Sequence, residues 1–160
     1  MGTFDQKTGL YYGEPQTITH FGGKTMKQYN IFISHSWKHN DNDYKKLVEW
    51  LDNSDLTWHD FSVPMNDPIH TNGTDKQLYE AISNKIKYST IILMMGGNAS
   101  SYSKWIEKEI KIAKSDFSKP LIGISPWGTG QESQVVKKAA DEMVGWSSSS
   151  VIDAIKKWSN

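Results

Sequence analysis

Two glutamates lie two positions apart in the segment 101–117, SYSKWIEKEIKIAKSDF, and their surroundings differ. At roughly 100° per residue in an α-helix, Glu109 falls inside the apolar arc, one turn after Trp105. Glu107 falls among the lysines and is spaced i to i+4 from Lys111. An ionised carboxylate on an apolar face needs a specific partner or an opening to water. The spacing therefore singles out Glu109, either as a functional carboxylate or as one that ties down a group beneath the helix.

Polar and glycine residues follow three of the predicted strands at the points where those strands end. In an open parallel sheet, ligands bind outside the carboxyl ends of the strands, where the strand order reverses. The candidates at these ends are Ser34, His35, Ser36, Asp60, Gly96 and Asn98, together with the neighbouring aromatic residues Trp37 and Phe61. The alternative is that the serines and His35 satisfy loop backbone groups and that the glycine only permits a turn.

Several kinds of chemistry are disfavoured by missing motifs. The sequence has no GxxxxGK[ST] loop for a nucleoside triphosphate, and Ser125 lacks the GxSxG elbow of a hydrolase nucleophile. The third strand ends in Met94–Met95 rather than in a phosphoacceptor aspartate. The HNDND run at 39–43 lacks the glycine and the closing glutamate of a calcium loop. We therefore expect no resident metal and no cofactor.

Composition predicts one compact domain without a nucleic-acid or membrane surface. The chain has 160 residues, 37% of them hydrophobic, and its 18 basic and 18 acidic residues cancel. All the basic residues are lysines, so the guanidinium forks that read guanine are missing. There is no cysteine, and no apolar run approaches the roughly 18 residues that a membrane span needs. We expect a cytoplasmic protein.

The elements that would position these side chains alternate between short apolar runs and helical patterns. The strand runs are 31–33, 56–61, 91–95, 120–124 and 143–146, and the helical patterns are 44–51, 78–86, 101–117, 134–140 and 151–158. This alternation predicts an α/β, flavodoxin-like three-layer fold: a five-stranded parallel sheet in the order 2-1-3-4-5 with helices on both faces. The run 91–95 should be central and 56–61 nearer an edge.

Local signals refine this arrangement. Thr74 and Gln77 form a capping box at the start of a helix, and Ser150 is predicted to cap the last helix. The segment 62–73 is predicted to be an exposed loop. Residues 1–28 show no sustained period of either kind and are predicted to form an N-terminal arm ahead of the domain at 29–160.

The sequence from 29 to about 158 resembles the Toll/interleukin receptor (TIR) superfamily, and most closely the bacterial TIR-like domains of the Thoeris anti-phage defence family ThsB. The matching stretches are YNIFISHSW at 29–37, SVPMNDP at 62–68, LYEAISNKIKYSTIILMMG at 78–96 and NASSYSKWIEKEI at 98–110. The WxxxE spacing of Trp105 and Glu109 matches the segment in which enzymatic TIR domains carry their catalytic glutamate.

The resemblance implies cleavage of the nicotinamide N-glycosidic bond of NAD, as substrate rather than cofactor. Glu109 would be the catalytic residue, Ser34 and His35 would line the nicotinamide-ribose end, and the segment 62–73 would cover it. Tyr102 and Trp105 join the candidates for substrate binding. In Thoeris-like enzymes the ADP-ribose becomes a cyclic or conjugated nucleotide signal that activates a separately encoded effector.

A second hypothesis comes from a different functional class. The chain could be a non-catalytic TIR-like module that acts by self-assembly or by docking to a partner, and Glu109 would then be a structural carboxylate. Release of nicotinamide from NAD by the pure protein distinguishes the two hypotheses.

Overall fold

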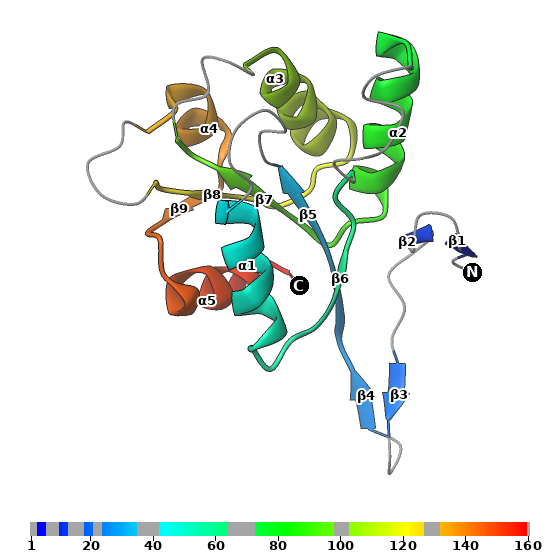
Figure 1. The fold of residues 1–160 in the computed structure, drawn as a ribbon, viewed down its shortest axis with the longest axis vertical. Coiled ribbons are helices and arrows are strands. Elements are labelled where there is room, and N and C mark those ends of the chain that lie inside the picture. The colour runs from blue at the N-terminus through cyan, green and yellow to red at the C-terminus, as the bar shows by residue number, and fades with distance from the viewer. Residues whose placement is uncertain are drawn as a thin grey trace.

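The computed structural model describes residues 3–5, 10–12, 18–20, 24–34, 42–63, 73–97, 103–126 and 132–159. Strands and helices alternate along the chain from residue 28 onward (Figure 1). The elements in order are β5 (Gln28–Ser34), α1 (Asn42–Asp52), β6 (Thr57–Asp60), α2 (Asp75–Lys87), β7 (Ile91–Met95), α3 (Ser103–Lys111), η3 (Ile112–Asp116), β8 (Leu121–Ile124), α4 (Gln134–Ala139), β9 (Glu142–Val144) and α5 (Ser148–Trp158).

The central sheet has the predicted topology. Its strand order is β6-β5-β7-β8-β9, which is 2-1-3-4-5 in chain order, and every neighbouring pair is parallel. The apolar strand β7 is central and β6 lies at an edge, as the sequence predicted. The α/β fold with helices on both faces is therefore confirmed.

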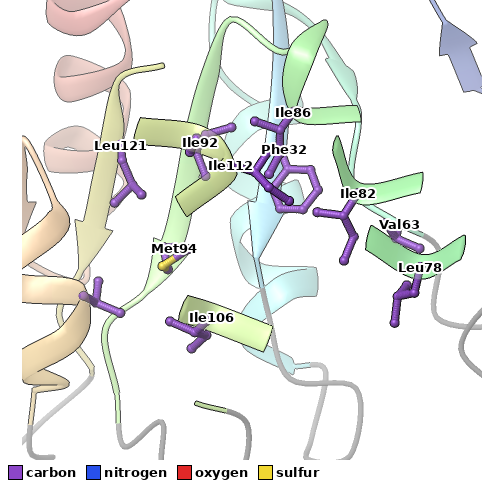
Figure 2. Close-up of a cluster of buried hydrophobic side chains, with 12 residues drawn as sticks. Phe32, Val63, Leu78, Ile82, Ile86, Ile92, Met94, Ile106, Ile112 and Leu121 are labelled. Carbon is purple, nitrogen blue, oxygen red and sulfur yellow. The ribbon is translucent and has the colours of Figure 1, made fainter. Parts of the chain in front are cut away.

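Side-chain alternation along the strands builds one core on each face of the sheet. On β5, Ile31 and Ile33 point into a cluster with α1 and α5, whereas Phe32 points into a cluster with α2, α3 and α4. Figure 2 shows Phe32, Ile92 and Met94 of this second cluster together with Ile106 of α3. The helices that cover the Phe32 face include the one that carries Glu109.

Two helix starts show how well local signals predict caps. The Thr74 side chain accepts from the Gln77 backbone N–H, and the Gln77 side chain accepts from the Thr74 N–H, so the predicted capping box is confirmed. The predicted cap at Ser150 is wrong. Ser147 caps α5, and its hydroxyl oxygen accepts from the Ser150 N–H, so Ser150 already lies in the first turn.

The N-terminal arm contains strands that its sequence did not predict, and two other expectations need correction. Residues 1–28 show no sustained period, yet two antiparallel pairs form there: β1 (Thr3–Asp5) with β2 (Leu10–Tyr12), and β3 (Ile18–His20) with β4 (Lys24–Met26). Strands of three residues offer too few alternations to be recognised.

The segment predicted as an exposed loop begins with two buried residues, Ser62 and Val63. The helix predicted over 101–117 changes at 112 to a π-helical turn, in which the Phe117 N–H donates to the Ile112 carbonyl.

Within the described ranges, no helix is both long enough and apolar enough to cross a membrane.

Candidate active site

Ser34 ends strand β5 on the sheet face that α3 covers. Residues alternate sides along a strand, so Ser34 shares a side with Phe32 and points away from the cluster that holds Ile33. It pairs in register with Met94 of the central strand β7 and is only 5% exposed. A buried hydroxyl at the carboxyl end of β5 needs a polar partner.

Glu109 of α3 is that partner. The Ser34 hydroxyl donates a hydrogen bond to Oε2 of Glu109, a buried contact between residues 75 positions apart. Glu109 is 8% exposed, whereas Glu107, two residues earlier, is exposed. The helical spacing therefore predicted both orientations correctly, and the structure brings together two of the residues that the sequence singled out.

Burial controls the ionisation of Glu109. Loss of water around the carboxyl group raises its pKa from an ordinary 4.5 to about 7, and the hydrogen bond from Ser34 opposes part of that rise. Among the described residues, no lysine or histidine forms an ion pair with Glu109. Near neutral pH the group therefore exists as a mixture of acid and carboxylate, a condition that is common for groups that take part in chemistry.

Asp60 ends the neighbouring edge strand β6, and both of its carboxylate oxygens accept hydrogen bonds. Oδ1 accepts from the Ser62 backbone N–H at 2.8 Å, and Oδ2 accepts from the Tyr44 hydroxyl of α1. The Ser62 hydroxyl oxygen in turn accepts from the Ile33 N–H at 2.9 Å. A substrate contact for Asp60 stays a prediction, and its contacts within the protein tie the end of β6 to β5.

Gly96 lies directly after β7, where the backbones of two strands and a loop meet. Its N–H donates to the Ile124 carbonyl and its own carbonyl accepts from the Ser133 N–H, each at 2.7 Å. A Cβ atom at this position would lie 2.9 Å from the Ile124 carbonyl oxygen. Packing therefore accounts for the glycine, and its predicted contact with substrate is not tested.

The remaining candidates have different positions. Phe61 is buried, and its N–H donates to the Ile31 carbonyl at 2.8 Å, which extends the β5–β6 ladder. Trp105 packs against the Phe32 cluster, with Lys108 Nζ 4.4 Å from its ring centroid. His35, Ser36, Trp37, Asn98 and Tyr102 lie outside the described residues, as do positions 64–72 of the segment predicted to cover the site.

Two residues of this region did not appear among the predictions. The helical pattern 44–51 predicts only an apolar position at Tyr44, and the segment 62–73 predicts only the start of a loop at Ser62. A signal for Ser62 was available, since Asp60-x-Ser62 is the spacing at which an aspartate accepts from the backbone two residues on. The Tyr44 contact joins different elements and leaves no mark in local sequence.

The site contains one buried carboxyl group, whose pKa lies near neutral pH, and a hydroxyl that donates a hydrogen bond to it. A carboxylate in low dielectric can stabilise a developing positive charge, because electrostatic interactions are strong where water is excluded.

Comparisons with known proteins give the following matches. The family model described as "Thoeris protein ThsB, TIR-like domain" matches residues 32–131. The solved structure titled "Structure of Clostridium botulinum CMP N-glycosidase, BcmB" aligns with a TM-score of 0.46 at 14% identity, over 81% of this chain and 99% of that chain. A comparison with curated proteins finds no match.

Proposed function

The chain belongs to the family of TIR-like domains of the Thoeris protein ThsB, and from that premise we propose that it cleaves the nicotinamide N-glycosidic bond of NAD. The observation that carries the proposal is the buried carboxyl group of Glu109, held by Ser34 at the carboxyl end of β5. Glu109 is the catalytic residue of the proposal.

Cleavage of this N-glycosidic bond requires only one carboxylate from the protein. The bond between ribose C1′ and the pyridinium nitrogen breaks, and its electron pair goes to that nitrogen, so neutral nicotinamide leaves. The ribose acquires oxocarbenium character, which a carboxylate that holds the ribose hydroxyls can stabilise and orient. Because the leaving group is already neutral when it departs, no second carboxyl group is needed to protonate it.

A nucleophile then adds to C1′, and a water or hydroxyl nucleophile gives up its proton as the new bond forms. With water the product is ADP-ribose, and with a hydroxyl or ring nitrogen of the same molecule the product is cyclic. With a second small molecule the product is a conjugate. Exclusion of water from the site decides among these outcomes, and a cyclic or conjugated product is the one that we propose.

The biological role that we propose is the production of a diffusible nucleotide signal for a separately encoded effector in anti-phage defence. To test this, a reaction of the protein with NAD is filtered below protein size, and the filtrate is added to the candidate effector. Activation by the filtrate supports a signal-making enzyme. Activation that needs the protein itself, and never the filtrate, would instead support a docking module.

A further inference from the structure

Three residues link α1 to the end of β5 through a chain of hydrogen bonds, which we call the loop relay: Tyr44, Asp60 and Ser62. The Tyr44 hydroxyl donates to Oδ2 of Asp60, and Oδ1 of Asp60 accepts from the Ser62 N–H at 2.8 Å. Burial, and then the negative charge of Asp60, raise the pKa of Tyr44 above its ordinary value, so the phenol keeps its proton and remains a donor.

The end of the relay contacts the backbone of β5 just beyond the end of β6. Strand β6 ends at Asp60, which pairs with Ile31, and the Phe61 N–H donates to the Ile31 carbonyl of β5. Beyond that point the Ser62 hydroxyl oxygen accepts from the buried Ile33 N–H at 2.9 Å. This bond, worth about 0.5–1.5 kcal/mol net, ties the residue before Ser34 to the segment that follows β6.

Ile33 directly precedes Ser34, whose hydroxyl must reach Glu109. The position of the Ile33 amide sets the position of the next Cα atom, and hence the reach of the Ser34 side chain. We propose that the loop relay is a positioning device that holds Ser34 where its hydroxyl bonds Glu109. This inference rests on the proposed function and assigns its positioning residues.

The same strand carries a matched control at its other end. There the Thr90 hydroxyl oxygen accepts from the Asn30 N–H at 3.0 Å, again a side-chain oxygen that satisfies a β5 amide. Thr90 lies before β7, at the amino ends of the strands, away from Ser34. Thr90→Val and Ser62→Ala therefore remove the same type of bond from the same strand, and only Ser62→Ala removes it next to the site.

The experiment follows the Glu109 carboxyl group directly, by ¹³C NMR of protein labelled at glutamate carboxyl carbons. The Glu109 signal is assigned by its loss in Glu109→Gln. Because the Ser34 bond lowers the pKa of Glu109, Ser34→Ala should raise the carboxyl midpoint. We expect Ser62→Ala and Tyr44→Phe to raise it in the same direction, with Ser62→Thr and Thr90→Val at the wild-type value.

Steady-state kinetics with NAD as substrate should separate the variants in the same way as the titration. Ser62→Ala should lower kcat by about tenfold with KM little changed, since misplacement of a catalytic group weakens the transition state more than binding, and Ser62→Thr should restore kcat. If Ser62→Ala does not fold, Tyr44→Phe decides, because it removes a single partly buried hydroxyl. A Glu109 midpoint that moves in Ser34→Ala but stays at the wild-type value in the relay variants overturns the inference. A wild-type protein that releases no nicotinamide defeats the proposed function, while the titration still decides the relay.

Discussion

The hydroxyl of Ser34 donates to the carboxyl group of Glu109 across 75 residues of sequence, and this bond joins the end of strand β5 to helix α3. Both side chains are buried between the helix and the sheet. The bond therefore fixes the helix against the sheet and modulates the ionisation of the carboxyl group.

Loss of the Ser34 hydroxyl should impair catalysis more than stability. In Ser34→Ala the Glu109 carboxyl group keeps its burial and loses its donor, so its pKa should rise above about 7. We expect kcat for nicotinamide release to fall by about tenfold or more at neutral pH, through misplacement of Glu109. The check is steady-state kinetics beside a thermal unfolding curve. Unchanged kcat in a folded Ser34→Ala protein would remove Ser34 from the account.

The rate should depend on pH through Glu109. The proposed chemistry needs the carboxylate, and burial raises the pKa of that group to about 7. Hence kcat/KM, which reports the free enzyme, should rise about tenfold per pH unit below neutrality and level off above it. Ser34→Ala should move the midpoint upward. A profile that is flat between about pH 5 and pH 8 would show that ionisation of Glu109 does not control the reaction.

Stability should change with pH in the opposite sense. The folded protein holds the Glu109 proton up to about pH 7, whereas the unfolded chain releases it near 4.5. The folded state therefore binds more protons between these values, and the free energy of unfolding falls as pH rises through the window, by up to about 3 kcal/mol.

The matched variant isolates this contribution. Glu109→Gln has no proton to lose, so its stability relative to wild type should increase between about pH 5 and pH 8 by a similar amount. Urea unfolding of both proteins at several pH values measures the difference. Parallel curves for the two proteins would contradict the raised pKa.

The two glycines after β7 should differ in tolerance. A methyl group on Gly96 would lie 2.9 Å from the Ile124 carbonyl oxygen, whereas one on Gly97 would meet, among the described residues, only Pro126 Cβ at 3.7 Å. We expect Gly96→Ala to lower the free energy of unfolding by about 1–3 kcal/mol and Gly97→Ala to change it little. Chemical denaturation of the pair is sufficient, and equal stabilities would argue against the close approach of β7 to β8.

Sequence reasoning worked where a single element carries the signal. The 3.6-residue period separated Glu109 from Glu107, and the end of an apolar strand pointed to Ser34. The parallel order of the sheet followed from the alternation of strand and helix patterns.

It failed where two elements must meet. Local sequence indicates only a loop at Ser62. Its buried hydroxyl accepts from the Ile33 amide on a strand 29 residues away, and local sequence does not show such a contact. Tyr44 fitted an apolar helix position because its ring is apolar, while its hydroxyl reaches Asp60 on another strand. Among the serines at 147–150, sequence could not tell which one begins the helix, since each can serve as a cap.

The central claim is that Glu109 cleaves NAD, and its most direct test is nicotinamide release measured by chromatography for wild type, Glu109→Gln and Glu107→Gln at equal concentration. Glu107 is the matched control, because it lies on the same helix two residues earlier and is exposed. The account predicts release by wild type and Glu107→Gln, and none by a Glu109→Gln protein that remains folded. Nicotinamide release by folded Glu109→Gln at the wild-type rate would contradict it.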